Sequence, residues 1–208
     1  VRKEHLIDEL WPESSPGAGE ATFKVALHRL RRSLEPDLSS RFGSSYIHLK
    51  HGYLSLDTEL CRTDIYRFQL LCRDMMRGIR SGDVKQATQV FQRADALYSG
   101  DFLPDEADRI AGPVREHVRQ VFIEAQFEAA RLYQSRGSWT KAIYHYQRII
   151  SCDPLLEEAY RRIMRLYAEQ GKRSKALQVY EQCRMTLQSE LGVDPEETTT
   201  SLYRKIRG

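Results

Sequence analysis

The second half of this sequence matches itself when it is shifted by 34 residues, and this repeat constrains the fold more than any other feature. The matching positions are Ala125 with Ala159, Leu132 with Leu166, Tyr133 with Tyr167, Gly137 with Gly171, Lys141 with Lys175, Ala142 with Ala176, and Tyr146 with Tyr180. Each copy predicts an amphipathic helix, a turn at a glycine that adopts a left-handed backbone, and a second helix. One such helix pair cannot cover its own apolar face, so the pattern predicts stacked pairs.

A less regular copy of the same unit lies upstream. Residues 81–91 (SGDVKQATQVF) parallel residues 136–146 (RGSWTKAIYHY), and YSGDFLPDEAD (98–108) between the copies has the glycine and proline of a loop. Length and pattern resemble tetratricopeptide repeats, which implies a concave face that holds a peptide, another subunit or a ligand. An ordinary helical bundle with accidental spacing is the alternative. We expect a tetratricopeptide-like domain over residues 62–208.

Positive charge is concentrated in one short window of the N-terminal part. Residues 21–52 carry six Lys or Arg and two acidic residues, a net charge of +4, whereas residues 1–20 carry a net charge of −3. The whole chain has a formal net charge of only +3, which is too mild to indicate a nucleic-acid partner by itself. The local basic window is therefore the more informative feature.

Helical periodicity places the basic window on a helix. Residues 3–11 predict a short helix, ESSPGAG (13–19) a loop, and residues 20–34 a second helix that Pro36 ends. Four apolar residues of the second helix share one stripe that we expect to be buried: Phe23, Leu27, Leu30 and Leu34. The basic residues project mainly from the other side of this helix.

A β-hairpin is expected after the basic helix. Two β-prone runs, around residues 46–49 and 53–56, are joined through Lys50, His51 and Gly52, and glycine supplies the positive φ of a tight turn. Short helix, loop, basic helix and hairpin in this order predict a winged helix-turn-helix over residues 1–58. In such a module the second helix enters the major groove of DNA.

The segments EHLIDELWP, ALHRLRRSLEP and YIHLKHGYLSL resemble the C-terminal effector domain of OmpR-type bacterial regulators. Followed by the repeats, they resemble the SARP family of bacterial activators, and YSGDFLP and ELGVDPEETT resemble its bacterial transcriptional activator domain. The resemblance implies a mainly α fold: a truncated winged helix-turn-helix with a β-hairpin wing, then a tetratricopeptide-like helical repeat domain. The N-terminal sheet and first helix of the OmpR-type module have no counterpart, so we expect a fragment of a longer protein.

The resemblance also implies which residues contact DNA. The recognition-helix positions fall on Lys24, His28, Arg29 and Arg31. Arg29 is the expected base reader, because a guanidinium pairs bidentately with guanine O6 and N7. His28, Arg31 and Arg32 are expected to contact phosphates, which sets register without reading sequence. At the tip of the hairpin, the expected contacts are Lys50 and His51.

The implied partners are double-stranded promoter DNA, RNA polymerase through the acidic loop 11–20, and a second copy in a homodimer. The repeat domain is a candidate site for a peptide or small molecule, with five tyrosines as lining candidates, half of them expected in the core: Tyr133, Tyr144, Tyr146, Tyr160 and Tyr167. We therefore predict a sequence-specific transcriptional activator. The alternative is a tetratricopeptide-like binding module without independent DNA binding.

Other classes of function find no support in the sequence. There is no glycine-rich phosphate loop, GxSxG or HExxH motif, so we expect no enzyme, no catalytic residue, no cofactor and no metal site. The four cysteines lack CxxC spacing and are expected to be packing residues in a reducing compartment. No apolar run is long enough to span a membrane and no export signal is evident, which predicts a cytoplasmic protein.

Overall fold

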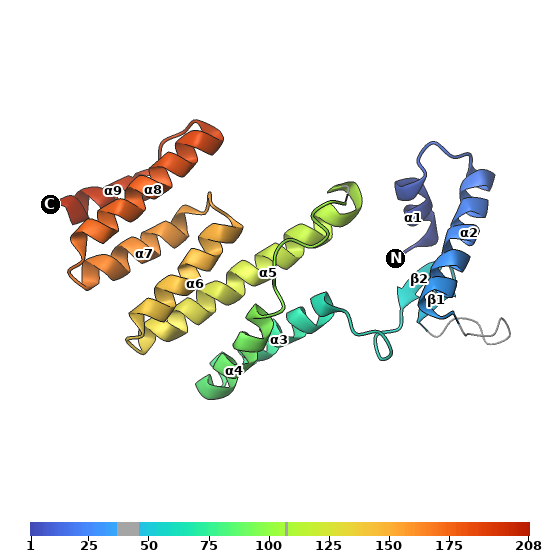
Figure 1. Ribbon diagram of the computed structural model, residues 1–208, viewed down its shortest axis with the longest axis horizontal. Helices are drawn as coiled ribbons and strands as arrows, with labels where there is room; N and C mark the ends of the chain where they lie inside the picture. Colours follow the sequence, from blue (N-terminus) through green and yellow to red (C-terminus); the bar gives the residue numbers. More distant parts are fainter. Residues whose placement is uncertain (37–45, 107) are drawn as a thin grey trace. The chain divides into compact units, whose positions relative to one another are not determined.

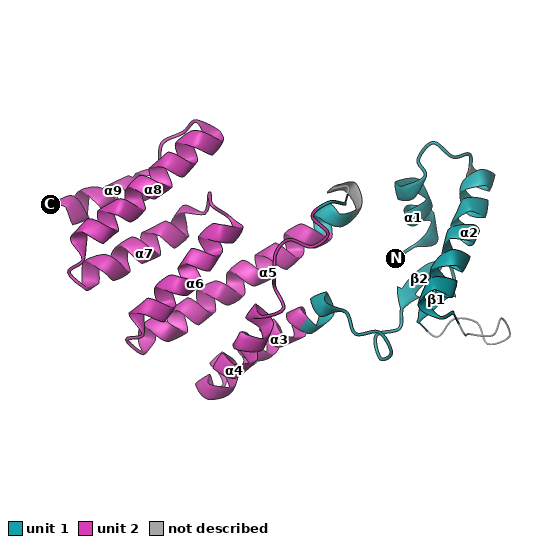
Figure 2. Cartoon of the chain, in the orientation of Figure 1, with its two compact units in different colours: residues 1–67, 105–113 teal, residues 68–104, 114–208 magenta. Residues whose placement is uncertain are grey.

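The structure is a computed structural model that describes residues 1–36, 46–106 and 108–208. It is mainly helical, as predicted (Figure 1). The chain divides into two compact units (Figure 2): residues 1–67 with 105–113, and residues 68–104 with 114–208. Among the described residues, no helix is both long and apolar enough to cross a membrane.

The first unit has the predicted order of two helices and a hairpin. Its elements are α1 (Lys3–Leu10), α2 (Pro16–Leu34), β1 (Ile47–Lys50) and β2 (Tyr53–Leu56). The strands pair antiparallel, with Lys50 opposite Tyr53, and the two-residue turn has φ of 52° at His51 and 78° at Gly52. Two successive positive φ angles are those of a type I′ turn, whose twist matches that of the strands. The helix pair and hairpin wing of the predicted winged helix-turn-helix are present.

The residues that precede α1 pair with the hairpin as a third extended segment. Val1 and Leu54 exchange backbone hydrogen bonds of 2.8 Å in both directions, and the Lys3 amide donates to the Gly52 carbonyl at 2.8 Å. Arg2 forms an isolated β-bridge with Tyr53. The wing is therefore tied to the start of α1, a contact between distant parts of the sequence that local pattern did not indicate.

The prediction of a loop over residues 13–19 is wrong in its second half, because α2 already begins at Pro16. Proline fits the first helical turn, where its missing N–H has no helical partner to lose. Gly19 is needed for packing: a Cβ there would lie 2.7 Å from Cγ2 of Ile7 on α1. Pro16 and Gly19 are typical of turns, but here the first starts a helix and the second lets α1 approach that helix.

The expected buried stripe of α2 is only half buried. Phe23 and Leu27 are 4% and 7% exposed, whereas Leu30 and Leu34 are 47% and 46% exposed. With eight residues, α1 is about 12 Å long and α2 with nineteen about 28 Å. The core around Phe23 and Leu27 also includes Leu6, Ile7, Trp11, Tyr46, Ile47 and Leu54. The last turns of α2 extend beyond this core, so the prediction for Leu30 and Leu34 is wrong within the described residues.

The second unit is built from helix hairpins. Its helices are α3 (Asp64–Arg80, beginning in the first unit), α4 (Val84–Asp95), α5 (Asp108–Ser135, likewise), α6 (Trp139–Cys152), α7 (Glu157–Glu169), α8 (Arg173–Leu191) and α9 (Glu197–Arg207). Gly82, Gly137 and Gly171 have φ of 77°, 68° and 69° at the turns within the three pairs. The three predicted copies are thus helix pairs that turn on glycine.

Small residues allow the paired helices to approach one another. Ala87, Ala142 and Ala176 of the second helices are fully buried. In the first pair, a Cβ on Gly78 would lie 3.1 Å from that of Ala87, a tight contact that the glycine avoids. The aromatic residue four positions after each alanine is buried too, as for Tyr146 at 0% exposure. Packing of this kind explains why the repeat is visible in the sequence.

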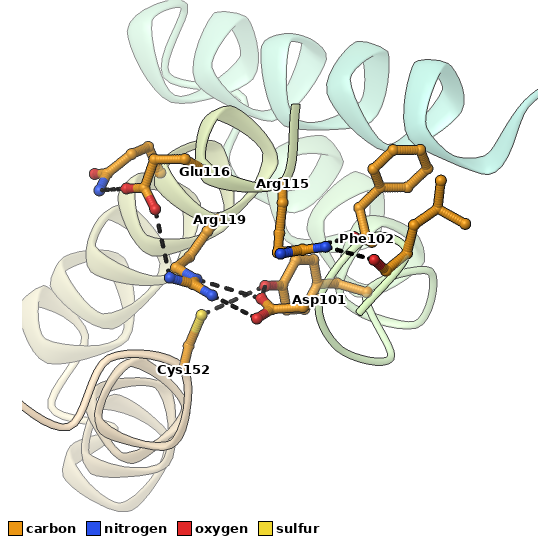
Figure 3. Close-up of polar contacts among 9 residues, drawn as sticks. Asp101, Phe102, Arg115, Glu116, Arg119 and Cys152 are labelled. Atoms are coloured by element: carbon orange, nitrogen blue, oxygen red, sulfur yellow. Dashed lines mark hydrogen bonds and ion pairs between the residues drawn. The ribbon is translucent and has the colours of Figure 1, made fainter. Parts of the chain in front are cut away.

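The insert between α4 and α5 lies against α5 as a strap, defined as residues 97–106. Figure 3 shows Arg119 and Arg115 of α5 directed at it: Arg119 pairs with the carboxylate of Asp101, and Arg115 Nε donates to the Phe102 carbonyl at 2.9 Å. The ring of Tyr98 stacks on Phe122 at 3.8 Å between centroids. Residues 98–102 of the predicted loop are therefore held by specific contacts with α5.

A carboxylate fastens the last helix of the second unit. Both side-chain oxygens of Glu157, on α7, accept hydrogen bonds from the backbone N–H of Glu196, at 2.9 and 3.1 Å. Arg161 Nη1 donates to Thr199 Oγ1 at 2.8 Å. The backbone N–H of Glu196 and the hydroxyl of Thr199, both in the VDPEETT segment, thus dock α9 on α7.

The cysteines are free thiols, as expected of packing residues. Burial raises the pKa of Cys72 and of Cys183 to about 12, which keeps both protonated and unreactive near neutral pH. Within the described part of the chain, no group of three or more His, Cys, Asp or Glu side chains could hold a metal ion.

Candidate nucleic-acid interface

One face of α2 presents exposed cationic side chains to solvent. Lys24, His28 and Arg32 are spaced four residues apart, so they form a row along the helix, and Arg29 lies beside that row. All four side chains are exposed. Val25, on the same side, is also exposed at 51%, so none of the described parts of the chain covers this face of the helix. An exposed α-helix with this face has the dimensions of an element that enters the major groove.

The charged groups at the start of the row are linked to α1. Glu20 forms ion pairs with Lys3 at 3.0 Å and with Lys24 at 3.6 Å. The hydrogen bond from Lys3 is the main reason that the pKa of Glu20 is lowered. Lys24 therefore shares its counterion with α1. Among the described residues, no side-chain hydrogen bond or ion pair involves the guanidinium group of Arg29 or Arg32, and both side chains are exposed.

Arg31 differs from its neighbours in position. It is half-buried, and its Nη2 donates to the main-chain carbonyl of Ile47, the first residue of β1, at 3.0 Å. Its Nε is buried without a hydrogen-bond partner among the described residues. The side chain thus connects α2 to the hairpin, whereas the other three arginine and histidine side chains of the basic helix point to solvent.

The hairpin tip carries the two predicted wing residues. Lys50 and His51 are both exposed, on either side of the start of the turn. The opposite end of the hairpin is closed by His48 Nε2 and Asp57 Oδ2, which are 3.2 Å apart. The pKa of Asp57 is lowered, mainly by the hydrogen bond from the backbone N–H of Leu60 and then by the hydrogen bond with His48. The structure therefore holds the base of the wing and leaves its tip accessible.

His48 and Asp57 were not among the predicted site residues. Asp57 directly follows β2, and its Oδ1 accepts from the amides of Glu59 and Leu60 at 2.9 and 3.0 Å. An aspartate two or three residues before such amides is a recognisable local signal for a turn. Its pairing with His48 depends on the strand register, which the sequence did not fix in detail.

The tyrosines suggested as a ligand-binding face are mostly structural. Tyr133, Tyr146 and Tyr160 are at most 8% exposed, while Tyr144 is 50% exposed. This agrees with the expectation that about half of them belong to the core. The five side chains do not form a common binding surface in the second unit.

Comparison with known proteins shows what the second unit and the whole chain are similar to. The family model described as "Bacterial transcriptional activator domain" matches residues 63–207. A search of solved structures finds the chain titled "Mycobacterium tuberculosis EmbR in complex with low affinity phosphopeptide", with a TM-score of 0.74 and 22% sequence identity. That match covers all of this chain and 54% of the EmbR chain, and it supports the fold.

Sequence relatives span both units. The regulatory protein DnrI of Streptomyces peucetius is 27% identical over 209 residues, a match that covers 97% of this chain and 75% of DnrI. The regulatory protein AfsR of Streptomyces coelicolor is 26% identical over 203 residues, which again cover 97% of this chain but only 20% of AfsR. The chain therefore spans most of one curated relative and one fifth of another.

Proposed function

Because the chain belongs to the bacterial transcriptional activator domain family, we propose that it acts as a sequence-specific DNA-binding transcriptional activator. The observation that carries the proposal is the row of exposed cations on α2 beside a hairpin with Lys50 and His51 at its tip. In this proposal residues 1–58 bind promoter DNA and residues 62–208 form the activator domain. The start of the family match at residue 63 supports that boundary.

The family and the relatives support a role in transcription regulation directly. The SARP-type resemblance is confirmed by the family match and by the similarity to DnrI and AfsR, which are named regulatory proteins. The family is one of transcriptional regulators, so the chain is not an enzyme. The DNA contacts of individual residues, the homodimer and the contact with RNA polymerase are our proposal.

In the proposed complex, α2 lies in the major groove and Arg29 reads a guanine. Its exposed guanidinium, free of described partners, supports this role, since a bidentate pair with O6 and N7 discriminates against other bases by about 1–3 kcal/mol. His28, Arg32 and Lys24 would contact phosphates, and Lys50 and His51 would lie over the minor groove or backbone. Each phosphate contact adds salt dependence without sequence preference.

Selection of bound duplexes from a randomised library with the 208-residue chain would supply the unknown target sequence. Affinity for the selected duplex is then measured by fluorescence anisotropy at several salt concentrations. We expect Arg29→Ala to relax the preference at one base pair, and Arg32→Ala to weaken binding to all sequences and lower the salt slope by about 0.9. Equal affinity for the selected and a scrambled duplex would refute sequence-specific binding.

For Arg31 the geometry supports a positioning role over a direct phosphate contact, because its guanidinium is bonded to the Ile47 carbonyl at the start of the wing. Arg31→Ala should weaken DNA binding in the unaltered chain. The loss should shrink when Lys50 and His51 are already alanine, since the effect acts through the wing. An equal loss in both backgrounds, with a lower salt slope, would instead indicate that Arg31 itself contacts a phosphate.

We also propose a homodimer and a contact with RNA polymerase. Residues 11–15, the part of the predicted contact loop that precedes α2, are mostly exposed and include the acidic Glu13, which suits a basic partner surface. Light scattering after size exclusion tests the dimer, and loss of RNA polymerase binding by Glu13→Lys tests the contact. The alternative, a peptide- or ligand-binding module without independent DNA binding, is favoured by an open groove in the second unit.

A further inference from the structure

The open groove follows the outer side of α8, between that helix and α9. It has a volume of about 710 Å³ and is lined by Ser174, Leu177, Gln178, Glu181, Gln182, Met185, Thr186 and Tyr203. The α8 residues recur at intervals of three and four, so they form one stripe about 18 Å long. Met185 is 64% exposed, so its apolar side chain is open to a partner.

This stripe is distinct from the face that holds α8 in the domain. Ala176, Tyr180, Cys183 and Leu187 are buried against the rest of the second unit. Helix α8 therefore carries apolar residues on two sides, of which one packs in the core and the other lines the groove. On the groove side, the half-buried Leu177 and the exposed Met185 lie eight residues apart, and Tyr203 of α9 borders them.

Cationic side chains gather at one end of the groove. Arg207 lies over the ring of Tyr203, with its Cζ 6.0 Å from the ring centroid. Arg173 precedes the lining residue Ser174, and one of its Nη atoms is 3.1 Å from the position that a Cβ on Gly208 would take, so the start of α8 and the end of α9 converge (Figure 1). Both arginines are exposed.

Among the described residues that line the groove, no unpaired acidic side chain offsets these two arginines. Glu181, the acidic lining residue, is paired with Arg184 at 2.9 Å. Lysine and arginine also stand at the start of α8, where the helix dipole disfavours positive charge and no acidic residue occupies the first turn. The groove thus combines an apolar floor with one positive end.

We propose that this groove docks an amphipathic helix of a separate partner protein, with an apolar stripe that covers Leu177 and Met185 and acidic residues at one end that face Arg173 and Arg207. Helix-in-groove recognition uses anchors at intervals of three and four residues, which is the spacing of the α8 stripe. Exposed methionine suits such a surface because its flexible side chain adapts to a partner.

The apolar floor and the asymmetric charge together favour this occupant. A DNA backbone would use the arginines but would gain nothing from Met185 and Leu177, since phosphate contacts are made by polar and charged groups. A second copy of the same surface would bring two positive ends together unless it docked in the opposite direction. The proposal stands independently of DNA reading by the first unit.

The experiment uses the 208-residue chain and designed peptides of about 18 residues held helical by a side-chain bridge. One peptide has a leucine stripe and glutamates in its end turn; a second has lysines in place of those glutamates; a third has the first composition with the stripe scrambled. Binding is measured by anisotropy. We expect only the first peptide to bind the unaltered chain, and Met185→Glu, at an exposed position, to abolish that binding without loss of fold.

A charge swap separates specific docking from general stickiness. Arg173→Glu with Arg207→Glu should weaken binding of the acidic peptide by about tenfold and should allow the lysine peptide to bind. The matched control, Lys85→Glu with Arg136→Glu, changes two exposed cations of other helix pairs and should leave both affinities unchanged. Equal binding of all three peptides, absence of any binding, or self-association that Met185→Glu abolishes would each overturn the proposal.

Discussion

His145 should make the second unit sensitive to mild acid. The residue is 7% exposed on α6, and its Nδ1 is 2.8 Å from Oε1 of Gln126, which is itself fully buried. Since Gln126 Nε2 donates to Asp95 at 2.5 Å, its oxygen faces the histidine and requires an N–H from Nδ1. The imidazole also stacks on Tyr133 at 5.2 Å between centroids. This environment accommodates the neutral ring.

Burial lowers the pKa of His145 from 6.5 to about 4, with the nearby Asp95 opposing the shift and Arg148 adding to it. Between these two values the unfolded chain holds a proton that the folded chain excludes, so the free energy of unfolding falls as pH falls through this window. The stabilisation is complete above the unfolded pKa and lost on approach to the folded pKa. At 1.36 kcal/mol for each pKa unit, the loss is about 3 kcal/mol.

Urea denaturation followed by circular dichroism between pH 4 and pH 8 measures this effect. His145→Gln keeps an N–H donor but does not titrate, so its curve should be flatter by about 3 kcal/mol over the same interval. Carboxylates with lowered pKa, such as Glu158, also lose stabilisation in acid, but they do so equally in both proteins. Parallel curves for the two proteins would refute the argument.

Two further substitutions test packing and capping. Gly19→Ala should destabilise the first unit by about 1–3 kcal/mol, because its Cβ would lie 2.7 Å from Cγ2 of Ile7. Gly17→Ala, whose Cβ would have nothing within 4 Å, should be neutral or stabilising. Thermal melts that rank the two variants otherwise would contradict the packing. Glu157→Gln should lower the free energy of unfolding by about 1–2 kcal/mol and speed amide exchange in α9, because one charged acceptor of the Glu196 amide is lost. Unchanged amide exchange in α9 would exclude this anchoring role.

The helical repeats could be predicted because their determinants are local and recur. The glycine at each turn indicates the local backbone conformation, and the alanine in each second helix indicates close helix packing. The same pattern recurs in three copies, which strengthens the prediction. The hairpin was predicted for the same reason, since a two-residue turn ending in Gly52 is a short-range signal.

The errors arise where tertiary contacts decide the outcome. Gly19 is typical of a loop in sequence, but in the structure it packs closely against Ile7. Leu34 has the spacing of a core residue, but it is exposed because α1 is too short to cover it. Likewise, the letters of the basic helix do not distinguish Arg31 from Arg32. Only the position of the Ile47 carbonyl separates an arginine bonded within the protein from one that faces solvent.

The strap between α4 and α5 has a consequence for cooperativity. In an array of repeats, each unit contacts only its neighbours, so the stability of the array depends on the interfaces between neighbouring units. Here Tyr98, stacked on Phe122, and Asp101, paired with Arg119, supply an interface across the interruption. The inserted residues therefore add to the direct contact between Asp95 of α4 and Gln126 of α5, and we expect the first helix pair and the later ones to melt in a single transition.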